Sequence, residues 1–426
     1  MKKIILPILL VIFLILISCT GYYLFYLNSN PHIYPDDSYT GTLAAEYTFP
    51  FKDSSVTLFV SVPASTYQGA GNAGSKTIPY TKILTLEYYN NIINDPLQEE
   101  MYAQILDQTD HVRTSWSLTD DEYVELLATF VQSIPYTTKE DYRYPVETVI
   151  DKFGDCDDKS MLLAGLLTRA GYDAVLLVFE EESHATVGIK TTDTTAYPDT
   201  GGYAILETTS YSYVTDKSFT FEDGTSLKST PVVITAGEGT KIYTAGYQIE
   251  AILAYRDKAA ELINQLSAKT ESNTNTLETM EETITQYEND LNSLAALMDA
   301  KLSAYNAYID QANAVTTQQK KLNSDYSSNK ITYAEYVQQW DILKAEQTEL
   351  LTAADEAWDG YTAYQTEYET LYAEYQAYFS TYTSTYATYS STVGEQNRFV
   401  DIYNLIISEP YNREYVYQTV VNSPNL

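Results

Sequence analysis

The stretch Gly154-Asp155-Cys156-Asp157-Asp158-Lys159 decides the fold of the central part of this chain. Apolar residues at helical spacing follow it, and they predict a helix that ends at Gly171: Met161, Leu162, Leu163, Leu166, Leu167 and Ala170. In this helix Asp155 is the expected N-cap, Cys156 the first residue and Asp158 the capping-box partner. Unpaired backbone N–H groups and the helix dipole favour a thiolate at Cys156, although the flanking carboxylates oppose it.

A histidine and a carboxylate follow this cysteine on strand-like segments. Residues 173–179 form a short β-type run, and His184 opens a second run over residues 184–189. A third candidate strand, residues 203–206, leads directly to Glu207. The expected roles are nucleophile for Cys156, general base for His184 and acceptor of the second imidazole N–H for Glu207. A nearby imidazole also predicts a thiol pKa well below its ordinary value of about 8.5.

Five motifs in this order resemble the transglutaminase-like superfamily over about residues 119–214: Phe130-Val131-Gln132-Ser133-Ile134-Pro135-Tyr136, Tyr144-Pro145-Val146-Glu147-Thr148, Gly154-Asp155-Cys156-Asp157-Asp158, His184-Ala185 and Glu207-Thr208-Thr209. The resemblance implies an α+β, papain-like core with cysteine, histidine and acid on a helix and two strands. In that superfamily the motif of the acid usually reads Asp-Pro-Thr, and here Glu207-Thr208-Thr209 takes its place. Glu207 departs from it by one methylene and can do the same orienting work.

The expected function is that of a transglutaminase-like cysteine enzyme acting on amide bonds of a protein or peptide substrate, cell-envelope material included. Cys156 would attack the amide carbonyl, and His184 would protonate the leaving amine. Water as the final acceptor gives a peptidase or amidase, and an amine gives a transamidase; the residues do not choose between them. The rival interpretation is a non-catalytic surface scaffold that binds through its C-terminal helices.

The simpler interpretations of these residues were weighed beside the catalytic one. A lone cysteine is most often a small buried hydrophobe, and Glu207 could be a solvated carboxylate at a strand end. His111 has no catalytic context and is expected at the surface. Three histidines are too few for a zinc site, and calcium-loop spacing is absent from the sequence, so neither a metal nor another cofactor is expected.

Charge and cysteine count narrow the class of protein. The 426 residues carry a formal net charge of −33, which disfavours nucleic acids and anionic membranes as partners of the globular part. The two cysteines are Cys19 and Cys156, so no intramolecular disulfide can form after the N-terminal segment.

The N-terminal segment decides the expected compartment. Lys2 and Lys3 precede an apolar run that continues to Leu27, about 24 residues and enough to span ~30 Å of hydrocarbon. This favours an uncleaved transmembrane anchor with the rest of the chain outside the cytoplasm. The alternative is lipid attachment at Cys19, because Leu16-Ile17-Ser18-Cys19 fits a bacterial lipoprotein processing site.

Between the anchor and the core, an accessory region is expected. Alternating apolar residues on both sides of Asp53-Ser54-Ser55 predict a β-hairpin. Helical patterns follow over residues 84–106 and, from the capping box Thr119…Glu122, over residues 123–133.

The C-terminal part predicts a long antiparallel helical hairpin with its tip near residues 327–331. Residues 277–298 repeat apolar side chains with 3-4 spacing. A stripe of aromatic residues does the same in the second arm: Trp358, Tyr361, Tyr364, Tyr368, Tyr372, Tyr375, Tyr378, Tyr382, Tyr386 and Tyr389. This stripe is expected to pack on the first arm, with a ligand-binding strip as the alternative. Polar residues 270–276 could interrupt the first arm.

The sequence thus predicts an α+β chain with an N-terminal transmembrane helix, a papain-like transglutaminase core and a C-terminal antiparallel coiled coil, which leaves a homo-oligomer open. The expected domains are an anchor or lipoprotein signal, an accessory region, a catalytic domain, a coiled-coil hairpin and a tail, over residues 1–30, 31–118, 119–245, 246–408 and 409–426.

Overall fold

The computed structural model describes residues 11–22, 31–73, 82–138, 142–192, 194–218, 220–221 and 224–422. Backbone contacts divide the chain into two compact units. The first unit contains residues 1–260 together with 400–426, and the second contains residues 261–399. The base of the predicted helical hairpin and the predicted tail therefore belong to the same unit as Cys156, His184 and Glu207.

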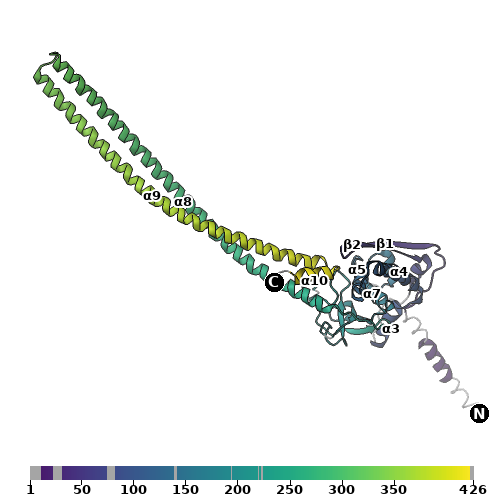
Figure 1. Ribbon diagram of the computed structural model, residues 1–426. Helices are drawn as coiled ribbons and strands as arrows, with labels where there is room; N and C mark the ends of the chain where they lie inside the picture. The colour runs from purple at the N-terminus through teal and green to yellow at the C-terminus, as the bar shows by residue number, and fades with distance from the viewer. Residues whose placement is uncertain are drawn as a thin grey trace, which may run out of the picture. The chain divides into compact units, whose positions relative to one another are not determined.

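The first unit combines helices with two small sheets, coloured purple to teal in Figure 1. Its elements before the long helices are β1 (Thr42–Phe51), β2 (Ser54–Pro63), α2 (Ala64–Asn72), α3 (Lys82–Ile93), the 3-10 helix η1 (Pro96–Gln98), α4 (Glu99–Trp116), α5 (Asp120–Gln132), α6 (Pro145–Asp151), α7 (Cys156–Arg169), β3 (Ala174–Phe179), β4 (His184–Lys190), β5 (Tyr203–Leu206) and β6 (Val232–Thr235).

The predicted β-hairpin is present as the antiparallel pair β1–β2, with Phe51 opposite Ser54. Alternate residues on one face are buried and the others are exposed. The predicted helix over residues 84–106 is divided into α3, η1 and α4. Asp95 causes the division, because its carboxylate accepts a hydrogen bond from the Leu97 backbone (3.0 Å) and caps η1 just before Pro96.

The second sheet is antiparallel and has the strand order β5-β4-β3-β6. Phe179 of β3 pairs with His184 of β4, so the histidine opens its strand at one end of the sheet. Helix α7 packs on β4 and β3, and α5 also packs on α7. The helix of the cysteine thus lies directly on the strand of the histidine.

The prediction of an N-terminal transmembrane helix is wrong. Residues 11–22, the described part of the predicted anchor, are helical. Among the described residues, no helix is both long and apolar enough to cross a membrane. The other parts of the predicted anchor, residues 4–10 and 23–27, lie outside the described residues.

Two long helices, α8 (Gly246–Ser327) and α9 (Tyr333–Ser408), supply all of the second unit, in which they run side by side and antiparallel (Figure 1). Side chains bridge them, for example Gln319 to Gln347 (3.1 Å) and Thr270 to Gln396 (3.2 Å). The turn between them ends at the capping box Thr332…Glu335. Residues 270–276 do not interrupt α8.

The last helix, α10 (Arg413–Val421), returns to the first unit. Its Val416 and Val420 are fully buried, and Arg413 is almost fully buried.

Candidate active site

Cys156 occupies the first position of α7, as the sequence predicts. The Asp158 backbone N–H donates to Asp155 Oδ1 (3.2 Å), and the Asp155 backbone N–H donates to Asp158 Oδ2 (3.3 Å). This reciprocal pair is the predicted capping box. The Arg143 backbone N–H also donates to Asp158 Oδ1 (2.9 Å), so the cap fastens α7 to the segment before α6.

Gly154 is required by the close packing just before the cap. A Cβ atom there would lie 2.9 Å from the Cβ of Asp158 and 3.0 Å from Cγ2 of Thr148. Both neighbours are buried, and Asp158 is held in the capping box. The glycine therefore allows the chain to approach the helix closely enough to present the cysteine.

One face of α7 directs Cys156 toward β4. Ser160, one turn after the cysteine, donates from Oγ to the Ala185 carbonyl (3.2 Å) and shares a hydrogen bond with Thr208 Oγ1 (3.0 Å). Residues four apart lie on the same helix face, so Cys156 also faces the start of β4. A hydrogen bond from the Ala185 backbone acts on the thiol and lowers its pKa. The sulfur therefore lies beside the residue that follows His184.

His184 and Glu207 form the predicted pair. His184 Nε2 lies 2.8 Å from Glu207 Oε2, and both side chains are buried. The second imidazole nitrogen, Nδ1, is on the other side of the ring. The Phe221 ring meets the imidazole edge to face, with 5.1 Å between the centroids, and restricts its orientation.

Glu207 is fixed by three donors on its other oxygen. Oε1 accepts from the backbone N–H groups of Thr208 (3.0 Å) and Thr209 (2.8 Å) and from the Thr209 hydroxyl (2.6 Å). Burial alone would raise the pKa of Glu207, but these hydrogen bonds and His184 outweigh it and lower the pKa. The longer glutamate side chain thus reaches the histidine while its loop holds it as a carboxylate.

The expectation of a lowered thiol pKa is wrong. Burial raises the pKa of Cys156 to about 12, and the neighbouring Asp157, Asp155 and Glu207 carboxylates add to the effect. Asp157 is itself disfavoured as an anion, since burial and Asp155 raise its pKa to about 7. In this structure the sulfur is therefore a neutral thiol at neutral pH.

Two supporting side chains escaped the sequence analysis. The fully buried Lys159 donates from Nζ to the Ile134 carbonyl (2.6 Å) and reaches the Thr209 carbonyl (3.4 Å), and burial lowers its pKa to about 8. Gln132 donates from Nε2 to the Glu207 carbonyl (2.8 Å). Gln132 lies in a quoted motif and Lys159 directly follows one, but nothing in the linear pattern indicates that they brace the loop of Glu207.

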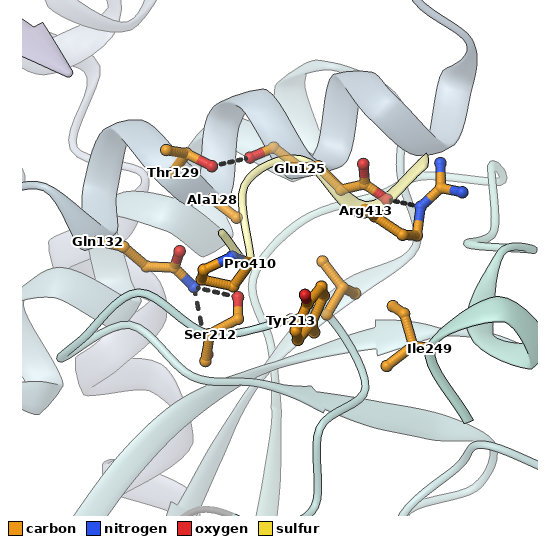
Figure 2. Close-up of a pocket in the computed structure, with 10 residues that line it drawn as sticks. Glu125, Ala128, Thr129, Gln132, Ser212, Tyr213, Ile249, Pro410 and Arg413 are labelled. Carbon is orange, nitrogen blue, oxygen red and sulfur yellow. Dashed lines mark hydrogen bonds and ion pairs between the residues drawn. The ribbon is translucent and has the colours of Figure 1, made fainter. Parts of the chain in front are cut away.

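Figure 2 shows Gln132 and the region where α5 meets the C-terminal segment. Gln132 also donates to the Ser212 carbonyl (3.1 Å), and two turns earlier on α5 Glu125 pairs with Arg413 of α10. The Tyr243 hydroxyl donates to the same carboxylate (2.7 Å). The pocket between these residues has no room for a water-sized molecule, so it is a packing interface.

One group of side chains at the start of α7 has the donor atoms for a metal ion. Asp155, Cys156 and Asp157 each place one donor atom within 4.8 Å of the others, and within the described ranges this is the one such group of three that could hold a metal ion. His184 is not part of this group. His111 is exposed on α4.

No protein-family model, no curated protein and no solved structure matches this chain.

Proposed function

We propose that the chain is a cysteine enzyme of the transglutaminase-like class that acts on amide bonds through Cys156, His184 and Glu207. The observation that carries the proposal is the buried His184–Glu207 pair at the start of β4, beside the thiol at the N-terminus of α7. It supplies a nucleophile, a base and an oriented carboxylate on three elements that pack together.

The raised thiol pKa favours general-base activation over a preformed ion pair. As the sulfur forms a bond to the amide carbonyl carbon, His184 Nδ1 takes the thiol proton. The imidazolium then gives that proton to the leaving nitrogen as the carbon–nitrogen bond breaks, and a thioester remains on Cys156. Glu207, held as a carboxylate, stabilises the imidazolium in between.

The second half of the reaction restores the enzyme. Water or an amine loses a proton to His184 and attacks the thioester carbonyl, and the thiol leaves with that proton. The backbone N–H of Cys156, at the first position of α7, is the proposed donor to the developing oxyanion. Hydrolysis and transamidation share all of these steps, and they differ only in the acceptor.

The acidic surroundings of the thiol favour a second candidate, a binding module that has the triad geometry but does not react. Asp155 and Asp157 both act against thiolate formation. Selective labelling of Cys156 by a thiol-reactive amide mimic at neutral pH supports the enzyme, and the absence of labelling supports the binding module.

The direct test is turnover of a casein-type protein in the presence of a fluorescent alkylamine. Mass spectrometry then detects both cleaved peptides and incorporated amine. We expect Cys156→Ala to abolish both products, while Cys19→Ala, the matched variant of the other cysteine, retains them. Activity that persists in folded Cys156→Ala protein would remove the assignment of the nucleophile.

For the compartment, we propose export with lipid attachment at Cys19, the alternative given by the sequence. The support is the Leu16-Ile17-Ser18-Cys19 pattern and the exposure of Cys19 on its helix. An alkyne-tagged fatty acid should label the wild type and Cys156→Ala during growth but not Cys19→Ala. Equal labelling of all three proteins would rule the attachment out.

A further inference from the structure

Helix α9 carries a continuous ladder of aromatic rings within the second unit. Its seven members are Tyr368, Tyr372, Tyr375, Phe379, Tyr382, Tyr386 and Tyr389. Neighbouring ring centroids along the ladder lie 5.9–6.4 Å apart. The ladder lacks the first three members of the predicted stripe and differs at a fourth, because Tyr378 lies beside Tyr287 of α8 (5.8 Å between centroids) and Phe379 takes its position.

The ring ladder is only partly the packed seam that the sequence predicts, because every second ring is half-buried and the rings between them are exposed. Tyr372, Phe379 and Tyr386 are 43%, 45% and 53% exposed. In the described second unit, no residue of α9 between Ala357 and Thr392 is buried. Such a long run of accessible rings on a surface indicates a binding site more often than a stabilising core.

Carboxylates accompany the rings on both helices. The α9 stretch 345–397 contains nine acidic residues and no lysine or arginine, and the α8 stretch 270–300 contains seven and none. Tyr382 donates its hydroxyl proton to Glu281 (2.7 Å), and Tyr375 donates to Glu288 (3.3 Å). In the described residues of both stretches, no ion pair neutralises these carboxylates.

A shallow groove of about 350 Å³ lies against the start of the ring ladder. Leu294 and Leu371 supply its apolar part, and Glu367 and Glu374 supply carboxylates. This combination suits a long cationic side chain, whose methylene groups lie on apolar surface while its charged end meets a carboxylate.

We propose that the ring ladder and its carboxylates bind an extended polypeptide rich in lysine and arginine. Cations are attracted to the faces of aromatic rings within about 6 Å, and the surrounding negative potential draws them there. The ladder from Tyr368 to Tyr389 is about 32 Å long, which matches roughly ten residues of extended chain. The proposal concerns the second unit alone and does not depend on the proposed enzymatic activity.

The negative charge around the ring ladder favours a basic polypeptide over the other classes of ligand. A second copy of the chain or a nucleic acid would bring further negative charge to the acidic surface, which is unfavourable. A neutral polysaccharide would use the rings but gain nothing from the carboxylates.

The test uses fluorescence anisotropy of labelled decalysine with the full-length protein at about 0.15 M salt. One variant combines Tyr372→Leu, Phe379→Leu and Tyr386→Leu. Its matched control combines Tyr247→Leu, Tyr333→Leu and Tyr415→Leu, which are exposed tyrosines outside the ladder. We expect the ladder variant to lose affinity at least about tenfold, because three cation–π contacts are removed, and the control to bind as the wild type does. Circular dichroism checks that both remain helical.

Two variants that each remove three negative charges distinguish a specific site from general electrostatic attraction. Glu281→Gln, Glu288→Gln and Glu374→Gln should weaken binding strongly, whereas the same change in charge at Glu100, Glu180 and Glu181 of the first unit should not. Equal losses from both sets, or an unchanged affinity in the ladder variant, would overturn the proposal. Two other results would also overturn it. In both, the ladder substitutions leave decalysine binding unchanged; they abolish instead either the binding of a neutral oligosaccharide or self-association measured by sedimentation.

Discussion

At the scale of single residues, the environment of the thiol determines how Cys156 can react. A helix N-terminus and a histidine both favour a thiolate, but burial and three carboxylates favour the neutral thiol and win in this structure. The consequence is a thiol that should react slowly with simple reagents; if Cys156 is the proposed nucleophile, it should be activated mainly when a substrate is bound.

Asp157 is the charged group that contributes most to the raised thiol pKa. In a Cys19→Ala background, we expect Asp157→Asn to lower the thiol pKa and to speed alkylation by iodoacetamide several-fold at pH 8.5. Because the pKa of Asp157 is about 7, its charge is lost below that pH, so the difference from the wild type should grow as the pH rises through 7. Glu181→Gln, an exposed carboxylate in the β3–β4 turn, should change little. Identical pH–rate profiles for all three proteins would contradict the electrostatic account.

Glu207 is expected to act on catalysis and not on substrate binding. Glu207→Gln keeps the side chain's length but removes the charge that stabilises the imidazolium, so kcat should fall about 10²–10⁴-fold with KM nearly unchanged. Glu207→Asp keeps the charge but is one methylene shorter, and it cannot keep both His184 and the Thr208–Thr209 donors. We expect an intermediate loss, measured by steady-state kinetics. A change confined to KM would assign Glu207 to the binding of substrate.

At the scale of elements, the capping box of α7 fixes the position of Cys156 at the start of the helix. Gly154→Ala would force the new methyl group against Asp158 and Thr148 and should destabilise the first unit by about 1–3 kcal/mol. Gly71→Ala in α2 meets only Glu147 Oε1, at 3.9 Å, and should be neutral or slightly stabilising. Urea unfolding measures both variants. A neutral Gly154→Ala would show that the cap can move without cost.

Helix α5 links two parts of the first unit, the loop of Glu207 and the C-terminal α10. Gln132 holds the Glu207 carbonyl at one end of α5, and Glu125 holds Arg413 two turns earlier. Burial raises the pKa of Glu125 while Arg413 acts to lower it, so loss of the arginine would leave a costly buried carboxyl group. The loop of Glu207 is therefore held by α5, and α5 is itself held by α10 at the C-terminal end of the first unit.

At the scale of the whole molecule, the first unit is completed by residues far apart in sequence. Removal of residues 400–426 exposes the partners of Arg413, Val416 and Val420 and should lower the Tm of the first unit by several degrees. Replacement of residues 261–399 by a flexible linker of about 15 residues should leave that Tm nearly unchanged. Differential scanning calorimetry tests both. A lowered Tm in the linker variant alone would mean that the second unit stabilises the first.

The sequence by itself determined the local features, because these depend on neighbours along the chain. It located the capped start of α7, the strands that carry His184 and precede Glu207, and the turn between α8 and α9, all from helical or alternating spacing and capping residues. Spacing also placed the aromatic stripe on one side of α9, although Phe379 replaced Tyr378 in the ladder.

Only the tertiary structure decided the properties that depend on groups distant in sequence. The thiol pKa is raised because folding buries Cys156 and brings Glu207 within its field, which no local pattern reports. Lys159, Gln132 and Arg413 became structural supports through partners 25–288 positions away. Likewise, the 3-4 spacing of the tyrosines is the same for a buried seam and for a surface ladder. In the structure the packing of α8 against α9 leaves Tyr372, Phe379 and Tyr386 exposed and the other rings of the ladder half-buried.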